Sequence, residues 1–197
     1  MSLPALPLEL DRHGWLKPTA EVTLAPSPNQ DRRPSETEVS LLVIHNISLP
    51  PGQFGGPYVH DLFLNRIEVA DHPWFVNLEG LRVSAHFFIR RDGTIVQFVS
   101  ADRRAWHAGV SRHRGRERCN DFSIGIELEG TDHMPYLELQ YAALGKLVPL
   151  LRTHYPLAAV RGHSDIAPGR KTDPGPAFDW QRFAGVTETP LRQLPRR

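Results

Sequence analysis

The chain has little cysteine and little lysine, and both scarcities restrict what it can be. Cys119 is the only cysteine among 197 residues, so no internal disulfide can form. The formal net charge is only +1, so charge does not indicate a nucleic-acid partner and we expect none. Positive charge is nearly all arginine, because the only lysines are Lys17, Lys146 and Lys171. A lysine inside a functional loop of such a chain is therefore informative.

Long apolar runs are also missing. No stretch approaches the length of a transmembrane helix, so we expect no membrane partner. Residues 1–11 lack a basic start and a continuous apolar run, which predicts that no secretory signal peptide is present. Together with the single cysteine, this favours a reducing, cytoplasmic setting. We expect the protein to act as a monomer.

The composition that remains is that of an ordinary globular protein. Hydrophobic residues make up 40% of the chain and charged residues 23%, and the length suffices for one domain with a real core. We expect an N-terminal segment over residues 1–24, a single domain over 25–185 and a disordered tail over 186–197. Proline interrupts residues 1–38, which predicts irregular structure there.

Hydrophobic patterning predicts a mixture of strands and helices. An apolar, β-branched run predicts a buried strand that ends at His45, and Asp92-Gly93 between two strand patterns predicts a hairpin. Strands are expected at 40–45, 83–90, 94–99 and 122–130, helices at 58–65, 136–154 and 178–183, and a polar basic loop at 111–118. These elements predict an α/β (α+β) fold, in which helices flank a central mixed β-sheet.

The chemistry-bearing part of the sequence is the irregular stretch 162–175, in which glycine and proline exclude a regular helix or strand. It contains His163, Asp165, Lys171 and Asp173. Polar loops rich in functional side chains are typical of active sites. An imidazole and carboxylates within a dozen residues predict a metal site with a cation beside it.

The remaining metal ligands must come from elsewhere, because the local pair motif His-Glu-x-x-His is absent. His45 is the candidate, since it ends a strand and precedes a loop rich in glycine and proline. Catalytic zinc sites commonly have three protein ligands and leave one position for water, whose pKa falls to about 7 in well-known cases. His45, His163 and one carboxylate would form such a site. The residues alone leave Asp173 and Asp165 open as that carboxylate, with the other starting a turn or orienting a ligand.

Two further groups suit a hydrolytic reaction. Glu127 and Glu129 share one face of the strand at 122–130, and a carboxylate beside a metal-bound water can act as general base and then general acid. Lys171 can stabilise negative charge on a tetrahedral intermediate. The competing interpretation is a solvated strand face with two glutamates and an ordinary surface lysine.

Five segments together resemble a known family. They are residues 42–52, 84–87, 104–109, 119–132 and 162–175. These segments are similar to those of the AmpD-type N-acetylmuramoyl-L-alanine amidases, which belong with phage T7 lysozyme and the peptidoglycan recognition proteins. The resemblance runs from about residue 25 to residue 185 and implies an amidase with a mixed sheet and flanking helices.

The resemblance also implies roles for particular residues. His45, His163 and Asp173 correspond to ligands of a Zn²⁺ cofactor, Glu127 to the catalytic acid/base and Lys171 to the group that steadies the developing oxyanion. Asp165 then has a structural or supporting role. The implied reaction cleaves the amide between the lactyl group of N-acetylmuramic acid and L-alanine. AmpD-type enzymes act on 1,6-anhydro-muropeptides in cytoplasmic cell-wall recycling and thereby lower the signal for β-lactamase induction.

The resemblance further implies muropeptide contacts at Asn46, Trp106 and Arg118, and Arg82 is another candidate. An arginine suits the carboxylates of a stem peptide, and a tryptophan face suits a sugar. Trp74 departs from the pattern, because many relatives have a supporting tyrosine there. Two other functions stay open: a zinc amidase that acts on polymeric wall, and a non-catalytic peptidoglycan-binding module.

Overall fold

The computed structural model describes residues 7–196, and residues 1–6 and 197 lie outside the described part. A six-stranded sheet forms its centre, in the order β1 (Val22–Leu24), β5 (Ile95–Gln97), β4 (Phe87–Ile89), β9 (Ser123–Glu129), β3 (Leu41–Ile47) and β10 (Ala159–Gly162). The pairings β10–β3, β3–β9 and β9–β4 are parallel. β4 and β5 pair antiparallel as the expected hairpin. The mixed sheet expected from the sequence is thus confirmed.

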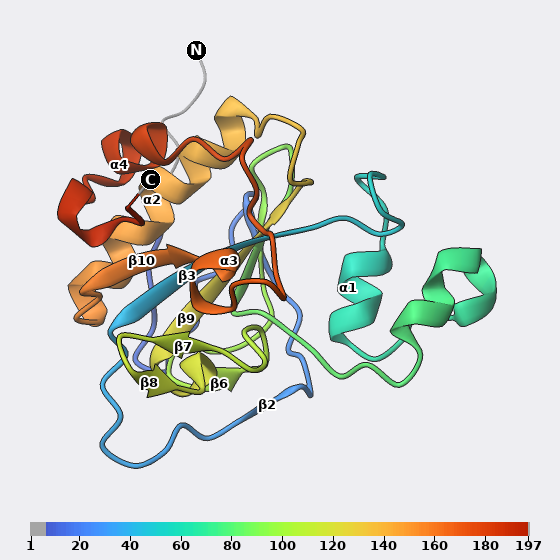
Figure 1. Ribbon diagram of the computed structural model, residues 1–197, viewed down its shortest axis with the longest axis horizontal. Coiled ribbons are helices and arrows are strands. Elements are labelled where there is room, and N and C mark those ends of the chain that lie inside the picture. The colour runs from blue at the N-terminus through green and yellow to red at the C-terminus, as the bar shows by residue number, and fades with distance from the viewer. Residues whose placement is uncertain (1–6, 197) are drawn as a thin grey trace.

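One face of the sheet is covered by two helices, α2 (Glu138–His154) and α4 (Trp180–Thr187), which lie together in Figure 1. Apolar residues recur on α2 at helical spacing and bury one stripe of it, including Leu144, Leu147 and Leu151. They pack with Leu42 and Ile44, whose side chains point to this face of β3, in the largest apolar cluster.

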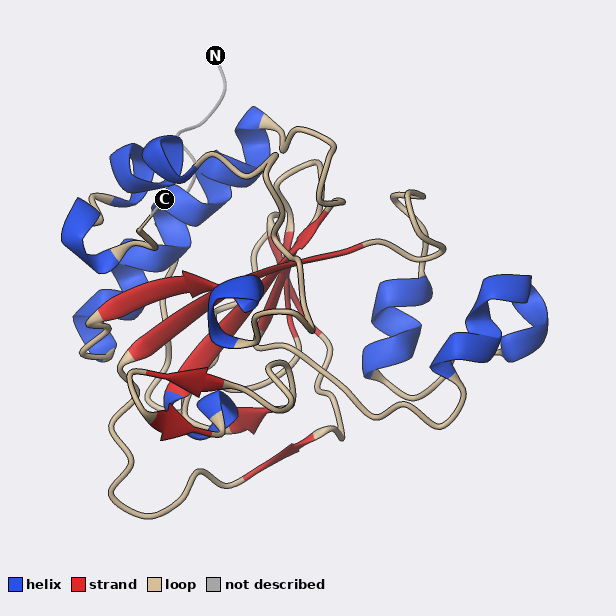
Figure 2. Cartoon of the chain, in the orientation of Figure 1, coloured by secondary structure: helices blue, strands red, loops and turns tan. Residues whose placement is uncertain are grey.

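The opposite face carries two smaller apolar clusters with a gap between them. One contains α1 (Tyr58–Phe63) and η2 (Pro73–Leu78), near η1 (Val69–Asp71). The other contains η3 (Cys119–Phe122), the one-turn helix α3 (His163–Ile166), Leu41 and Val43. Figure 2 shows α1 and η2 to the right of the sheet and α3 in front of it. Since side chains alternate along a strand, His45 follows Leu41 and Val43 on this face and lies where neither cluster covers it.

Two short pairings border the sheet. β2 (Gln30–Asp31) pairs with β6 (Arg104–Ala105), and β7 (Arg112–His113) pairs with β8 (Arg116–Glu117). The stretch 111–118, expected as a loop, therefore contains a small hairpin. Across residues 7–196, every helix is too short or too polar to span a bilayer.

The expected boundaries of the domain were wrong at both ends. The described part of the N-terminal segment adds β1 to the sheet, and Leu16 and Val22 are buried in the main cluster. At the other end, a short helix, η4 (Leu191–Gln193), brings Leu194 into the same cluster, so residues 186–196 are not a disordered tail. Isolated apolar residues between prolines are enough to attach an irregular segment to a core.

Candidate metal centre and active site

Three side chains from separate segments converge in the gap on the open face. The Nδ1 atom of His45 lies 3.0 Å from Nδ1 of His163 and 3.0 Å from Oδ2 of Asp173. Nδ1 of His163 lies 3.1 Å from the same Oδ2 atom. His45 is at the C-terminal part of β3, His163 opens α3 directly after β10, and these two strands are parallel neighbours. The carboxyl ends of parallel strands thus place both imidazoles at one edge.

The donor set and its geometry fit a metal ion. Two ligand atoms of a tetrahedral zinc, each about 2.1 Å from the ion, lie roughly 3.4 Å apart, a few tenths of an ångström more than the three distances between these atoms. The distal nitrogen of His163, Nε2, lies 3.1 Å from the carbonyl oxygen of Ala108 and must donate to it, so Nδ1 of the neutral ring keeps its lone pair for the cluster. His45, His163 and Asp173 can therefore hold a metal ion.

Asp165, the other carboxylate that the residues had left open, lies outside this cluster. Its Oδ2 atom accepts a hydrogen bond of 2.7 Å from the backbone N–H of Gly162, three residues back. This bond closes a capping box at the start of α3. Asp165 therefore shapes the turn that presents His163, whereas Asp173 faces the two imidazoles.

Glu127 reaches the cluster from the neighbouring strand. It is directly opposite His45 in the parallel pairing of β9 with β3, and its Oε1 atom lies 3.9 Å from Nδ1 of His45. The side chain is buried, and its Oε2 atom has no hydrogen-bond partner within residues 7–196. A buried, unpartnered carboxylate oxygen is costly to maintain and marks a group that is free to exchange a proton.

Burial and charge shift the pKa values of these groups in different directions. Burial raises the pKa of Glu127 well above its ordinary value, the charge of Asp173 adds to the rise, and Lys171 offsets part of it. Burial lowers the pKa of His45 to about 4. For Asp173 burial raises the pKa, but the close contacts with His163 and His45 outweigh it and hold the pKa below its usual range. Two carboxyl groups with opposite shifts in one site are suited to different roles.

The cluster opens into a cavity of about 650 Å³. Glu127 and Lys171 line it together with Asn46, Trp74 and Asp132. The side-chain amide of Asn46 donates a hydrogen bond of 2.8 Å to the carboxylate of Asp132, which fixes how the amide faces the cavity. The indole of Trp74 is partly exposed on the cavity wall, so it offers a surface but no titratable hydroxyl.

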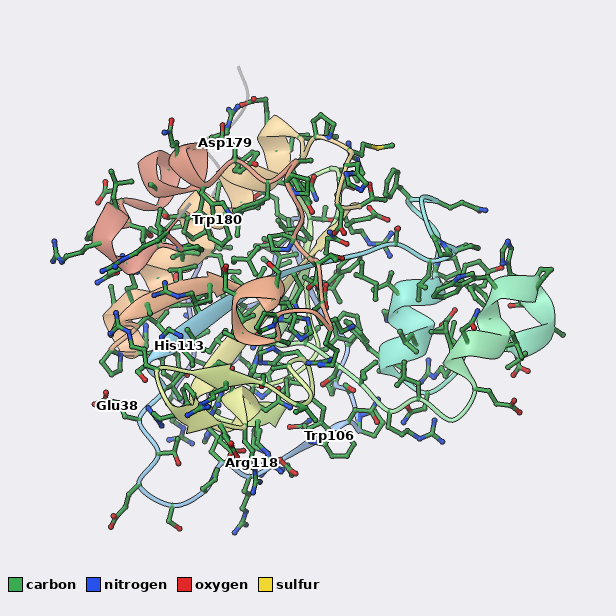
Figure 3. The ribbon with its side chains drawn as sticks, viewed as in Figure 1. Glu38, Trp106, His113, Arg118, Asp179 and Trp180 are labelled. Carbon is green, nitrogen blue, oxygen red and sulfur yellow. The ribbon has the colours of Figure 1, made fainter. Side chains whose placement is uncertain are left out.

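The other expected substrate contacts are more scattered. Arg118 lines an adjoining cavity of about 550 Å³, which shares Arg170 with the main one. Arg82 lines a smaller cavity of about 160 Å³. Trp106 is not among the residues that line the main cavity. Figure 3 labels Trp106 and Arg118 at the lower edge of the molecule, in the part that contains β2 and the β7–β8 hairpin.

Glu129 and Glu127 are both buried, which contradicts the solvated strand face considered above. The carboxylate of Glu129 accepts hydrogen bonds from the backbone N–H groups of Gly55 at 2.6 Å and Arg91 at 3.0 Å. It therefore ties the loop after β3 to the turn of the β4–β5 hairpin. The two glutamates are two residues apart on β9 but have different surroundings. Glu127 lines the cavity, whereas Glu129 holds two loops together by hydrogen bonds.

The sequence reasoning missed His107 as a site residue. Its ring lines the main cavity, and its Nδ1 atom lies 2.9 Å from Nε2 of His45. One signal was available in the sequence: Gly125 lies in the middle of a buried strand, where glycine often marks the close approach of another group. A Cβ atom at Gly125 would come within 2.5 Å of the His107 ring.

A cluster of three side chains that can hold a metal ion, a buried carboxyl group of raised pKa and an ammonium group on one cavity are the protein parts of a metal-dependent hydrolase. The family model described as N-acetylmuramoyl-L-alanine amidase matches residues 35–176. The chain belongs to this family, and it is an amidase.

Individual relatives support this membership. The 1,6-anhydro-N-acetylmuramyl-L-alanine amidase AmpD of Citrobacter freundii is 59% identical over 175 residues, which are 88% of this chain and 92% of that protein. The crystal structure of a selenomethionine derivative of AmpD superimposes with a TM-score of 0.86 at 57% identity and covers 90% of this chain and 98% of that one. Escherichia coli AmiD, in complex with the substrate anhydro-N-acetylmuramic acid-L-Ala-D-γ-Glu-L-Lys, gives a TM-score of 0.57 at 28% identity, over 90% of this chain and 65% of that one.

Proposed function

We propose that the protein is a zinc-dependent amidase that cleaves the amide between the lactyl group of 1,6-anhydro-N-acetylmuramic acid and L-alanine in muropeptides. The observation that supports this most is the cluster of His45, His163 and Asp173 with Glu127 beside it, at the base of a cavity of about 650 Å³. A cavity of that size accommodates a small sugar–peptide. The relative named AmpD shares more than half of its residues with this chain, and AmiD was solved with an anhydro-muropeptide.

His45, His163 and Asp173 are the proposed zinc ligands. Two nitrogens and one oxygen are a common ligand set for catalytic zinc. When bound, zinc supplies a Lewis acid that polarises the scissile carbonyl and lowers the pKa of a water molecule. Asp173 serves as an ionised ligand because its pKa is held low.

Glu127 is the proposed general base and acid. Its raised pKa allows it to accept a proton from the attacking water and to release it to the leaving amine of L-alanine. The unpartnered Oε2 atom is available for that proton. Lys171 lines the same cavity, and its ammonium group stabilises the oxyanion that develops at the carbonyl.

Asn46, Arg118 and Arg82 are proposed substrate contacts, with Asn46 in the main cavity and Arg118 in the adjoining one. Arg118 is well exposed and paired only to Asp121 at 3.3 Å, so it can exchange that partner for a carboxylate of the stem peptide. Trp106 is a further proposed contact, outside the lining of the main cavity.

The proposed setting is cytoplasmic recycling of soluble muropeptides, which thereby limits the signal that induces β-lactamase. The test is a comparison of substrates with purified protein whose zinc content has been measured. Soluble 1,6-anhydro-muropeptides and intact sacculi are offered separately, and released peptides are quantified by chromatography. We expect about one zinc per chain and faster release from the soluble substrate. A preference for sacculi would instead favour an enzyme of the polymeric wall, and binding without hydrolysis would favour a peptidoglycan-binding module.

A further inference from the structure

His107, which has no part in the proposed mechanism, lies directly behind the ligand His45. Its Nδ1 atom is 2.9 Å from Nε2 of His45, the nitrogen that faces away from the cluster. Its own Nε2 atom lies 3.1 Å from the hydroxyl oxygen of Ser123. The two rings stand nearly perpendicular, at 85°, and both are buried. His107 thus connects a proposed metal ligand to the first residue of β9.

The direction of every proton in this connection follows from one backbone carbonyl. The hydroxyl of Ser123 lies 2.5 Å from the carbonyl oxygen of Cys119, which can only accept, so Ser123 donates its single proton there. Ser123 must then accept from Nε2–H of His107. The neutral ring therefore has a bare Nδ1 atom, which accepts from Nε2–H of His45. His45 is left with the lone pair of Nδ1 pointing into the cluster.

Ala108, the residue after His107, binds the distal nitrogen of the second histidine ligand, His163. The carbonyl oxygen of Ala108 accepts from Nε2–H of His163. The segment 107–108 is itself fastened, because the side-chain oxygen of Asn120 accepts from the backbone N–H groups of His107 at 3.1 Å and Ala108 at 2.7 Å. Two consecutive residues thus hold the distal nitrogens of both histidine ligands.

The sheet makes room for this arrangement. An added Cβ atom at Gly125 would lie 2.5 Å from Cγ and 2.6 Å from Nδ1 of His107, well inside the contact distance of real atoms. The Gly125 conformation is not the reason for glycine there, since its φ is not positive. Glycine weakens the interior of a buried strand. At position 125 it is explained by the space that the His107 ring needs.

We propose that His107 is a positioning residue for the metal centre: it fixes the tautomer and orientation of His45 so that Nδ1 is ready for the ion before the ion arrives. Partners that accept from the distal N–H of a ligating histidine orient the ring and raise its basicity, and their loss typically weakens metal binding about 10- to 100-fold. This inference rests on the proposed zinc site.

The first test needs no substitution. Nitrogen-15 NMR of the zinc-loaded protein distinguishes protonated, bare and metal-bound imidazole nitrogens. We expect His107 to be protonated at Nε2 and bare at Nδ1, with His45 protonated at Nε2 and metal-bound at Nδ1. A proton on Nδ1 of His107, or a metal-bound Nε2 of His45, overturns the proposal.

The second test uses two substitutions of nearly equal shape. In His107→Asn the amide oxygen can take the place of Nδ1 as acceptor, whereas His107→Leu has no acceptor. We expect zinc affinity, measured by competition with a chromophoric chelator, to fall about 10- to 100-fold in His107→Leu and to be largely rescued in His107→Asn. His154→Leu, at an exposed histidine at the end of α2, is the control and should bind zinc like the wild type.

The outcomes separate the two claims. If the wild-type protein binds no zinc, the proposed function fails. Two outcomes with a zinc-binding wild type would overturn only the positioning role. In one, both His107 variants bind zinc as tightly as the wild type. In the other, both lose the same affinity while their metal-free forms have equal free energies of unfolding. Should His107→Leu not fold, Ser123→Ala removes the acceptor that sets the His107 tautomer, and the NMR signals should then report a mixture of tautomers.

Discussion

His45 and Glu127 are direct partners in the pairing of β3 with β9, and their side chains share the open face of the sheet, with Nδ1 and Oε1 3.9 Å apart. The distance between the proposed metal ligand and the proposed acid/base is therefore set by strand register. A register slip of one residue would turn Glu127 to the face covered by α2. β9 is buried along its whole length and β3 is buried from Leu41 to His45, which makes such a slip costly, so the sheet core protects the geometry of the site.

The first prediction concerns Glu127. Glu127→Gln keeps the shape of the side chain but removes the group that exchanges a proton. We expect turnover of 1,6-anhydro-muropeptide to fall about 10²- to 10⁴-fold, while zinc content stays near that of the wild type. Both quantities are measured on the same preparation, by metal analysis and chromatography of released peptide. Undiminished turnover would remove Glu127 from the mechanism.

The second prediction uses Glu129 as the matched counterpart, two residues along the same strand. Glu129→Gln weakens one or both hydrogen bonds to the N–H groups of Gly55 and Arg91. Hydrogen bonds to charged groups contribute about 1.5–3 kcal/mol each, so we expect the free energy of unfolding in urea to fall by about that much. Turnover at a temperature where the variant is folded should stay far above that of Glu127→Gln. Equal losses of turnover in the two variants would contradict the division between a catalytic and a structural glutamate.

The third prediction distinguishes the two carboxylates, Asp165 and Asp173, that follow His163 in the sequence. Asp173→Asn removes a ligand charge, and we expect it to abolish stoichiometric zinc binding in equilibrium dialysis. Asp165→Ala removes the acceptor of the Gly162 N–H group, which costs about 1 kcal/mol of stability as a helix cap but should leave zinc stoichiometry unchanged. The reverse pattern would assign the ligand role to Asp165.

The sequence predicts the sheet and the main helix well because both depend on local periodicity. The apolar run to His45 and the alternation along 122–130 correspond to β3 and β9, and the helical spacing of 136–154 corresponds to α2. The ends of the domain were not predictable in this way. Leu194 has Gln193 and Pro195 as neighbours and belongs to no periodic apolar pattern, so only the tertiary position of η4 brings it to the core.

The site residues that could be predicted from the sequence are those whose residue type alone indicates catalytic or metal-binding chemistry. His45, His163 and Glu127 stand out by residue type, but the choice between Asp165 and Asp173 depended on the turn that α3 makes, which spacing alone does not give. Local sequence patterns do not predict the role of His107, because its contact with His45 depends on the register of β9 and on the space beside Gly125.

The fourth prediction concerns Lys171. The chain has only three lysines, and Lys171→Ala removes the one that lines the cavity. Groups that stabilise an oxyanion typically contribute about 10²- to 10³-fold to turnover, so we expect a loss of that size in kcat with a smaller change in KM. Lys146→Ala is the control, because Lys146 is on α2 and pairs with Glu21 on the far side of the sheet. A loss that is confined to KM would indicate that Lys171 binds substrate without stabilising the transition state.

The last prediction concerns acid stability and involves His86, a buried histidine that is not a proposed ligand. Its Nδ1 atom accepts from the N–H of Gly125 at 3.0 Å, and its Nε2 atom faces the carbonyl oxygen of Arg103 at 3.0 Å and the guanidinium of Arg33 at 3.1 Å. Burial lowers the pKa of His86 well below its ordinary value, and the charge of Arg33 lowers it further. The ring of His107, 5.6 Å away, is neutral as well.

The sign of the effect follows from proton binding. Below about pH 6.5 the unfolded chain takes up a proton at His86 that the folded protein does not. The free energy of unfolding of the metal-free protein should therefore fall as the pH is lowered from about 6.5. For His86 the fall is at most about 1.4 kcal/mol per pH unit, and it ends when the pH reaches the lowered pKa of His86 in the folded protein. Urea unfolding between pH 8 and pH 5 measures the slope. His86→Asn, which keeps an acceptor for Gly125, should be less stable at pH 8 but show a shallower slope, whereas the exposed-site control His154→Asn should keep the wild-type slope. An unchanged slope in His86→Asn would show that His86 is not a source of the acid sensitivity.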